Sequence, residues 1–312
     1  MRNKVLVTGG CGFVGNHLVR RLIQDFEVVV LDNLSSGRRE NIADIEKKVK
    51  LIVGDILDAT TVKKAIRECR YVFHLAAQVS VEKATTNPQE DASVNIMGTL
   101  NLLEHAEKCE KIIIYSSAAV YGEPIQTPIK EEHPKNPKNP YGISKLTSET
   151  YANHYHKTYG LPVTILRPFN IYGPGQRKEN QYSGVITTFA EKIKNGENPI
   201  IYGDGTQTRD FIYIDDVVEA SILAAESEKA TGQTFNVGTG KATTINELAE
   251  KMIQIAGKKL KPIHTKSRTA EIKHSVADIY KIQKTLGYKP KTTLTQGLEK
   301  IMKLKMRQNK PK

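Results

Sequence analysis

The nonapeptide VTGGCGFVG, residues 7 to 15, constrains the fold of this chain more than any other feature. It follows the apolar run KVLVT and precedes a stretch in which apolar residues recur at helical spacing. Its G-x-G-x-x-G pattern assigns Gly10 to a tight turn, Gly12 to a close approach of a pyrophosphate and Gly15 to helix packing. The pattern predicts a strand, a glycine turn and a helix whose N-terminus faces phosphate groups.

Further apolar runs, separated by helical patterns, fill the first half of the chain. They are nearly continuous in apolar character, as expected for strands that helices cover on both faces. The alternation predicts an α/β fold with a doubly wound parallel sheet of the Rossmann type. The expected strands are residues 4–8, 27–32, 49–55, 71–76, 111–117 and 162–168, and the expected helices are 15–26, 59–69, 95–109 and 141–160.

An acidic residue, Asp32, ends the second expected strand soon after the glycine loop. A carboxylate there can accept both ribose hydroxyls and repels a 2′-phosphate, which favours NAD over NADP. Arg38 and Arg39 in the next loop are the opposing detail, because they could bind that phosphate. After the third strand, Asp55 could bond the adenine amino group with Ile56 beneath the ring, or could simply form a turn.

The composition of the sequence changes after about residue 170, where proline and glycine become frequent. We expect residues 1–170 to form an NAD-binding Rossmann domain, with later returns near residues 211–240. Residues 171–312 should form mainly a smaller C-terminal substrate-binding lobe. A cleft between two such parts is a common place for a substrate.

The heptapeptide NPYGISK, residues 139 to 145, raises the question of catalysis. If Pro140 starts a helix, Tyr141 and Lys145 lie one turn apart on the same face. A lysine beside a phenol can lower the pKa of that phenol. The same spacing is also common on ordinary half-exposed helix faces, so the spacing alone leaves both interpretations open.

Composition and charge exclude several classes of protein. The net charge of +12 is spread along the 312 residues among acidic side chains, which argues against a nucleic-acid partner. The apolar runs are too short for a membrane span or signal peptide, so we expect a cytoplasmic protein without membrane contact. The three cysteines are scattered, which argues against a metal site or a disulfide framework.

Ten motifs, in order along nearly the whole chain, resemble the extended short-chain dehydrogenase/reductase family in its nucleotide-sugar epimerase/dehydratase branch. Several are loose by themselves, but the ordered set is specific. The UDP-glucose 4-epimerases are the members that the chain resembles most. The motifs are TGGCGFVG, LDN, GDI, FHLAA, VNIMGT, YSSAAVYG, YGISK, LRPFNIYGPG, RDFIYIDD and FNVG.

The resemblance implies that Tyr141 and Lys145 are catalytic and that Ser117 completes the site. Tyr141 would remove a proton from a sugar hydroxyl while C4 passes a hydride to NAD. Ser117 would hold that hydroxyl in line, and Lys145 would bond the nicotinamide ribose. Lys145 and the positive nicotinamide should both lower the pKa of the phenol toward neutrality.

The residues after Ser117 distinguish among branches of the family. Sugar 4,6-dehydratases have two acids there that drive the elimination of water, and the related decarboxylases have Ser-Glu. This chain has Ala118 and Ala119 instead, which favours epimerisation through a 4-keto sugar. Many 4-epimerases have a threonine where Ala119 stands, so any role of a second hydroxyl is lost.

Other family positions are carried over one by one. Asn95 resembles a residue that links the catalytic helix to the cofactor, although it could also bond local backbone. Arg209 and Arg268 resemble the arginines that hold the nucleotide phosphates, but Pro-Gly is missing after Arg268. Ser275 matches the position of a bulky tyrosine, so we expect room for an N-acetyl group at C2. The cofactor set is Gly9, Gly12, Phe13, Val14, Gly15, Asp32, Asn33, Asp55, Ile56, Leu75, Ala76, Ala77, Asn95, Tyr141 and Lys145, and the substrate set is Ser117, Tyr141, Asn170, Val185, Arg209, Arg268, Glu271 and Ser275.

The resemblance also implies that the protein is a homodimer and that its substrate is a UDP-sugar, and it leaves alternative functions open. Helices at residues 95–108 and 144–158 resemble those of a four-helix homodimer interface. The expected substrate is a UDP-sugar, with UDP-glucose/UDP-galactose first and the N-acetylated pair second. Another epimerase of the branch, such as one for UDP-glucuronate, and a NAD-sensing binding protein stay open. His74 we expect to be a packed core residue.

Overall fold

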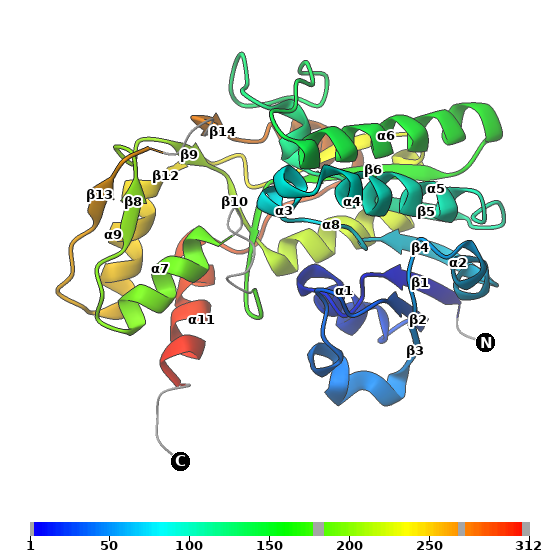
Figure 1. The fold of residues 1–312 in the computed structure, drawn as a ribbon, viewed down its shortest axis with the longest axis horizontal. Coiled ribbons are helices and arrows are strands. Elements are labelled where there is room, and N and C mark those ends of the chain that lie inside the picture. The colour runs from blue at the N-terminus through cyan, green and yellow to red at the C-terminus, as the bar shows by residue number, and fades with distance from the viewer. Residues whose placement is uncertain (1–2, 177–183, 268–271, 308–312) are drawn as a thin grey trace.

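A seven-stranded sheet, all parallel, forms the centre of the computed structural model, which describes residues 3–176, 184–267 and 272–307 (Figure 1). Its strand order is β11-β6-β5-β4-β1-β2-β3, so the chain winds outward from β1 in one direction and then in the other. This order confirms the expected doubly wound Rossmann fold. The strands are β1 (Lys4–Thr8), β2 (Glu27–Asp32), β3 (Val49–Val53), β4 (Cys69–His74), β5 (Lys111–Tyr115), β6 (Val163–Pro168) and β11 (Thr234–Val237).

Both faces of the sheet are buried, which explains the continuous apolar runs. Neighbouring residues of β1 show this, because Val5 packs into one core and Leu6 into the other. The helices cover the two faces separately (Figure 1). One face carries α1 (Phe13–Leu22) and α8 (Ile214–Glu226), and the other carries α2 (Ala59–Ile66), α5 (Gly98–Leu103) and α6 (Pro140–Tyr159).

A smaller lobe, to the left in Figure 1, contains most of the chain after β6. Its core is formed by Phe189, Leu248 and Leu298 with their apolar neighbours. The chain returns from this lobe to the sheet through α8 and β11, and β11 pairs with β6. The division of domains at residue 170 stays a prediction. The elements of the lobe are α7 (Val185–Lys194), α9 (Ile245–Ala256), α11 (Leu294–Arg307), β8 (Ile200–Tyr202), β9 (Thr208–Arg209), β12 (Thr243–Thr244), β13 (Ile263–Thr265) and β14 (His274–Ser275).

Several elements differ from the sequence expectations. In place of the single helix expected over residues 95–109, the chain forms α4 (Pro88–Ala92), a π-helical turn (Ser93–Met97) and α5, so the helical stretch begins earlier than expected and ends at Leu103. Hydrogen bonds of Asn95 to distant residues hold this turn, and such contacts leave no periodic signal. The sequence analysis missed several elements, among them a 3₁₀ helix (Arg39–Lys48), α3 (Val81–Thr86), α10 (Tyr280–Leu286), the pair β7 (Asn170–Tyr172) and β10 (Phe211–Tyr213), and the short strands of the smaller lobe.

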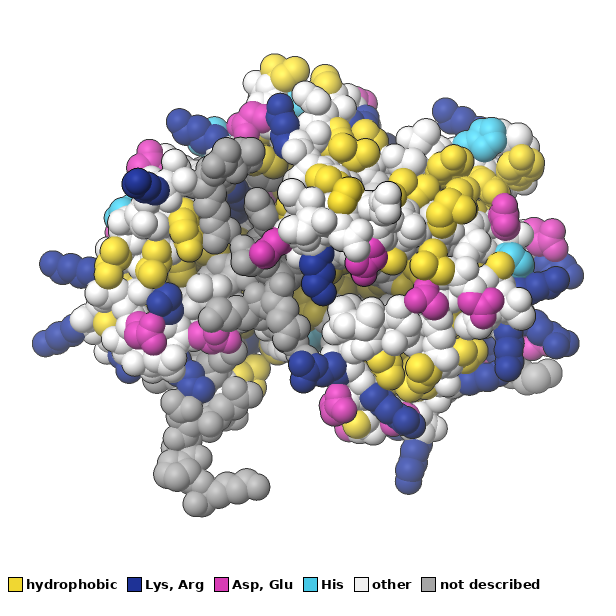
Figure 2. Space-filling view, in the orientation of Figure 1, with side chains coloured by type: hydrophobic (Ala, Val, Ile, Leu, Met, Phe, Trp, Pro, Cys, Tyr) yellow, Lys and Arg dark blue, Asp and Glu magenta, His cyan; other side chains and the backbone are white. Residues whose placement is uncertain are grey.

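The surface carries its positive charge at many separate places. Figure 2 shows Lys and Arg side chains distributed over the visible face with acidic side chains among them. Hydrophobic side chains gather on the same face over α5 and α6. None of the helices in the described ranges is both long and apolar enough to cross a membrane.

Candidate active site

The ends of β1 and β4 meet at the glycine turn. Gly9 has a φ of +72°, and a Cβ there would lie 2.7 Å from the amide nitrogen of Ala76. The hydroxyl of Thr8 accepts hydrogen bonds from the amides of Leu75 and Ala76, both at 3.2 Å. These contacts bring two segments of the expected cofactor set together, the glycine turn and residues 75–77.

The roles expected for the glycines need one correction. Gly9, rather than Gly10, takes the left-handed backbone that makes the turn. A Cβ on Gly10 would lie 2.7 Å from the side chain of Val30, so this glycine lets the turn pack on β2. G-x-G-x-x-G could not distinguish the two, because the position before the pattern is also glycine.

The start of α1 has the features of a phosphate site. Gly12 is the N-cap and offers no side chain to the amides of the first turn, which begins with the half-buried Phe13 and Val14. The contact that a Cβ on Gly12 would make within 4 Å is the Gly9 carbonyl at 3.1 Å, so its outer side is open. A Cβ on Gly15 would lie 2.1 Å from the same carbonyl. Gly15 therefore serves packing, and Gly12 leaves room for a ligand at unpaired N–H groups.

Asp32 lies beside this turn at the end of β2. Its carboxylate accepts hydrogen bonds from the amides of Cys11 at 2.9 Å and Leu34 at 2.8 Å. Burial raises the pKa of Asp32, and these two hydrogen bonds oppose that shift. Arg39 forms an ion pair with Glu46 on the 3₁₀ helix. One of the two arginines that could have bound the 2′-phosphate of NADP is therefore already paired. The geometry therefore agrees with the reading of NAD.

The end of β3 completes this side of the site. Asn33 donates to the carboxylate of Asp55 at 2.8 Å, and the other oxygen of Asp55 accepts from the amide of Leu57 at 2.8 Å. Asp55 thus forms the turn that was one of its two readings, and its contact with adenine stays a prediction. Ile56 is buried against Gly98, where a Cβ would lie 2.3 Å from the isoleucine side chain.

A chain of hydrogen bonds joins the glycine turn to the π-helical turn through a buried histidine. Thr99 donates its hydroxyl proton to the Asn95 carbonyl at 2.6 Å, so its oxygen accepts from Nε2 of His74, 3.1 Å away. Nδ1 of His74 then accepts from the Thr8 hydroxyl at 2.8 Å. Burial lowers the pKa of His74 to about 3, which keeps the ring neutral. His74 is the core residue that the sequence predicted.

Asn95 links the loop after β4 to α6. Its side-chain oxygen Oδ1 accepts from the backbone amide of Gln78 at 2.9 Å. Its side-chain nitrogen Nδ2 donates to the hydroxyl of Ser144 at 2.9 Å and to the carboxylate of Asp91 at 3.1 Å. Two of these partners are distant in sequence, so Asn95 does more than bond local backbone. Its contact with a cofactor stays a prediction.

Ser117, Tyr141 and Lys145 come together where β5 ends and α6 begins. Asn139 caps α6 by accepting from the amide of Gly142 at 2.9 Å, so Pro140 starts the helix as expected. Ser117 lies two residues after the end of β5, and a hydrogen bond joins its side chain to that of Tyr141. Lys145 is buried one helical turn further on.

The protonation of this pair differs from the expectation for the phenol. Burial raises the pKa of Tyr141 above its ordinary value, while the hydrogen bond from Ser117 lowers it and the charge of Asp91 raises it further. Burial also lowers the pKa of Lys145 to about 8, against the charges of Glu149 and Asp91. We expected Lys145 to lower the pKa of Tyr141, and this prediction is wrong for the protein residues without NAD. Burial of the phenol raises its pKa and is the largest effect.

Three of the expected substrate residues, Asn170, Arg209 and Ser275, lie next to Asp210. The side chain of Asn170 donates to the Asp210 carbonyl at 3.0 Å, and the Asp210 amide donates to the Ser275 carbonyl at 2.9 Å. Arg209 on the central strand β9 pairs in register with Ser275 on β14, so the two residues are neighbours in one small sheet. Val185 starts α7 in the same lobe. The remaining two predicted residues, Arg268 and Glu271, lie outside the described residues.

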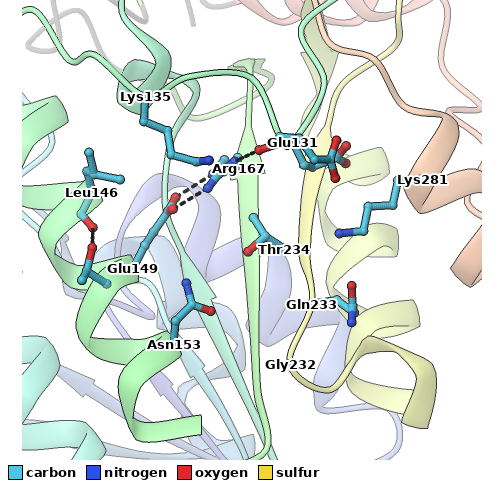
Figure 3. A pocket seen from close by; sticks show the side chains of 12 residues that line it. Glu131, Lys135, Leu146, Glu149, Asn153, Arg167, Gly232, Gln233, Thr234 and Lys281 are labelled. Carbon is cyan, nitrogen blue, oxygen red and sulfur yellow. Dashed lines mark hydrogen bonds and ion pairs between the residues drawn. The ribbon is translucent and has the colours of Figure 1, made fainter. Parts of the chain in front are cut away.

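A separate cavity of about 420 Å³ is lined by α6 together with residues 131–135 and 232–234. Figure 3 shows Glu149 on α6 pairing with Arg167 of β6 at this cavity, with N–O distances of 2.8 and 2.6 Å. At 100° per residue, the lining residues Leu146 and Asn153 lie on a different side of α6 from Tyr141. The cavity is therefore separate from the catalytic pair.

The sequence analysis missed three residues that hold the site, namely the buried Thr8 and Asp91 and the half-buried Gln78. Gln78 and Asp91 are hydrogen-bonded to each other at 2.9 Å and both bond Asn95. The available signal was the spacing of Asp91 and Asn95, four residues apart at the end of a helical pattern. A buried acid in that place is unusual unless it has a defined role.

Comparison with known proteins adds a family. The model of the family described as GDP-mannose 4,6 dehydratase matches residues 6–301. A putative UDP-glucose 4-epimerase of Methanocaldococcus jannaschii is 39% identical over 303 residues, which cover 96% of this chain and 97% of the relative.

Solved structures agree with this result. A UDP-glucose 4-epimerase from Thermotoga maritima with UDP-glucose has 37% identity and a TM-score of 0.93, covering 98% of this chain and 100% of the other. A UDP-N-acetylglucosamine 4-epimerase from Methanobrevibacter ruminantium, in complex with UDP-N-acetylmuramic acid, has 38% identity and a TM-score of 0.93, covering 99% and 100%. A Thermus thermophilus UDP-glucose 4-epimerase in complex with NAD has 36% identity and a TM-score of 0.88, covering 97% and 98%.

Proposed function

Because this chain belongs to the extended short-chain dehydrogenase/reductase family, in its NAD-dependent epimerase/dehydratase branch, we propose that it is a nucleotide-sugar 4-epimerase. The observation that carries the proposal is the hydrogen-bonded pair of Ser117 and Tyr141 with Lys145 one turn away. A NAD-sensing binding protein has no need of this set. The proposed first substrate pair is UDP-glucose and UDP-galactose.

NAD is the cofactor of this family, and when bound it accepts a hydride from C4 of the sugar and later returns it. The residues that fit it are Gly12 with the open first turn of α1, for the pyrophosphate, and Asp32, for the adenosine ribose. Lys145 would bond the second ribose. A positive charge on the nicotinamide would supply the lowering of the phenol pKa that Lys145 alone does not provide.

In the proposed mechanism, Tyr141 removes the proton of the sugar 4-hydroxyl while Ser117 holds that hydroxyl in line. Tyr141 then returns the proton after the 4-keto sugar has turned its other face to the site. Ala118 and Ala119 follow Ser117, where the dehydratases of the family have acids. Without an acid at these positions, elimination of water from C5 and C6 lacks its proton donor and base, which favours epimerisation.

The test of this proposal is a Tyr141→Phe variant, assayed for interconversion of UDP-glucose and UDP-galactose. We expect kcat to fall by about 10²- to 10⁴-fold, the usual contribution of a general acid–base group. Tyr151→Phe is the matched control, because Tyr151 is exposed on the same helix. An unchanged kcat in Tyr141→Phe would refute the mechanism, and formation of a 4-keto-6-deoxy sugar by the parent would replace epimerisation with dehydration.

The substrate range follows from the residue at position 275. A serine there leaves space beside C2 of the sugar, which supports acceptance of UDP-N-acetylglucosamine and UDP-N-acetylgalactosamine as well. One similar solved structure is a UDP-N-acetylglucosamine 4-epimerase. We expect Ser275→Tyr to reduce kcat/KM for the N-acetylated pair at least about tenfold more than for the unsubstituted pair. Ser275→Ala is the control, and equal losses for both pairs would contradict this assignment. UDP-glucuronate in the same assay tests the alternative substrate.

We further propose that the protein is a homodimer in which α5 and α6 of each copy meet. This proposal rests on exposed apolar side chains of the π-helical turn (Met97) and of α6 (Ile143, Tyr151 and Tyr159). The π-helical turn packs against α6, and Figure 2 shows hydrophobic side chains gathering over α5 and α6, which fits a self-complementary interface. Activity on a UDP-sugar without membrane or nucleic-acid partners fits the cytoplasm, which is the localisation that we propose.

A further inference from the structure

Asp91 is a buried carboxylate that the mechanism above does not use. Its side chain lies on α4 and the residue is only 1% exposed. One oxygen accepts hydrogen bonds from Gln78 at 2.9 Å and Asn95 at 3.1 Å. The other oxygen, Oδ2, has no hydrogen-bond partner among the described residues. Burial of a charged oxygen without a partner is costly, so it calls for an explanation beyond local structure.

The charge of Asp91 acts on both members of the catalytic pair. It opposes ionisation of Tyr141 and supports the charged form of Lys145. The second carboxylate close to Lys145 is Glu149, but both of its oxygens are engaged by the buried guanidinium of Arg167. Asp91 is therefore the negative charge near Lys145 that no described cation neutralises.

The other elements packed around Lys145 contribute little charge. His74 on β4 is neutral, because burial lowers its pKa to about 3. The π-helical turn and α5 contain no titratable side chains, and the 3₁₀ turn after Ser117 contributes only Tyr121. On α3, Glu82 and Lys83 are both exposed. Glu149 and Asp91 thus oppose the effect of burial on Lys145, and Asp91 is the one of the two that pairs with no cation among the described residues.

We propose that Asp91 is a positioning residue for the catalytic pair, which keeps Lys145 charged in a buried site and restrains Tyr141 from ionising before substrate and cofactor are bound. The hydrogen bonds from Gln78 and Asn95 fix its orientation, and Asn95 in turn holds Ser144 of α6. This proposal rests on the proposed function, since it assigns Tyr141 as base and Lys145 as the charged group.

Removal of the Asp91 charge should lower the pKa of both Lys145 and Tyr141. The pKa of Lys145 falls, because the ammonium loses a favourable charge, and the pKa of Tyr141 falls, because the phenolate loses a repulsion. Activity rises with pH as Tyr141 loses its proton and declines as Lys145 loses its own. Both limbs of the pH–rate profile in Asp91→Asn should therefore move to lower pH, each by about one unit. A purely structural role would lower activity without moving either limb.

The experiment compares the parent with Asp91→Asn, which keeps the shape and the acceptor oxygen. Glu90→Gln is the matched control, because it removes one charge from an exposed neighbour on the same helix. A direct titration of Tyr141 accompanies the kinetics in the holoenzyme with NAD. The chain has no tryptophan and 13 tyrosines, so the near-ultraviolet difference between each protein and its Tyr141→Phe version reports Tyr141. If Asp91→Asn folds poorly, Asp91→Ser removes the same charge with a smaller side chain.

The proposal holds if the Tyr141 titration and both kinetic limbs move down in Asp91→Asn and stay fixed in Glu90→Gln. It is overturned if Asp91→Asn leaves the titration where the parent has it, or moves it up. The spectroscopic titration needs no substrate, so it decides this question even if the substrate is wrong. Failure of the proposed function would instead appear as full activity in Tyr141→Phe.

Discussion

At the scale of single residues, His74 shows how a buried neutral group fixes the geometry of the site. It joins β1 to α5 because one ring nitrogen accepts from Thr8 and the other donates to Thr99. This arrangement requires the neutral ring, and burial lowers the pKa of His74 to about 3. The unfolded chain has an ordinary histidine, with a pKa near 6.5.

The consequence is a loss of stability on the acid side. Between pH 6.5 and about 3 the unfolded chain binds a proton that the folded chain does not, so the free energy of unfolding declines as the pH falls. From pH 7 to pH 5, His74 alone should account for about 2 kcal/mol of this decline. His74→Gln should flatten the decline by that amount in denaturant titrations. His154→Gln, which changes an exposed histidine, should reproduce the curve of the parent; a parallel curve for His74→Gln would contradict this account.

At the scale of elements, the junction of β1 and α1 separates two uses of glycine. Gly15 has no space for a Cβ, because the Gly9 carbonyl would lie 2.1 Å away. Gly12 has a tolerable contact at 3.1 Å and an open outer side. Gly15→Ala should therefore lower the free energy of unfolding by about 3 kcal/mol or more, measured by denaturant titration.

Gly12→Ala makes the complementary prediction for the same junction. Its unfolding free energy should stay within about 1 kcal/mol of the parent, while the affinity for NAD falls at least about tenfold in a calorimetric titration. The added methyl group would occupy the space into which the pyrophosphate fits. Equal loss of stability in both variants, or an unchanged affinity in Gly12→Ala, would show that the two glycines share one role.

The limits of sequence reading are clearest at this same scale. The strands could be predicted to within about two residues, because each is buried on both faces and written as a continuous apolar run. The pair Tyr141 and Lys145 could be found because it lies within one helix. The π-helical turn could not, since Asn95 is held by Gln78 and Ser144, which are far away in the chain. The spacing of Asp91 and Asn95 is visible in the sequence, but spacing alone does not distinguish a buried acid from an exposed one.

At the scale of the whole molecule, the apolar face of α5 and α6 predicts the oligomeric state. A charged residue within this face, in Ile143→Glu, should convert a dimer to a monomer in analytical ultracentrifugation, because a buried unpaired carboxylate opposes association. Ile125→Glu is the control, as Ile125 is exposed elsewhere. A parent protein that sediments as a monomer would remove the proposed interface.

The position of β11 at the border of the central sheet has a consequence for how the chain is made. Among the described residues its one sheet neighbour is β6, and the two strands are separated by β7, α7, β8, β9, β10 and α8. During synthesis, β6 must leave the ribosome with its open edge unpaired and wait until residue 237 has emerged. Nascent chains that stall before that point should be substrates for chaperones, and shortened gene products should precipitate.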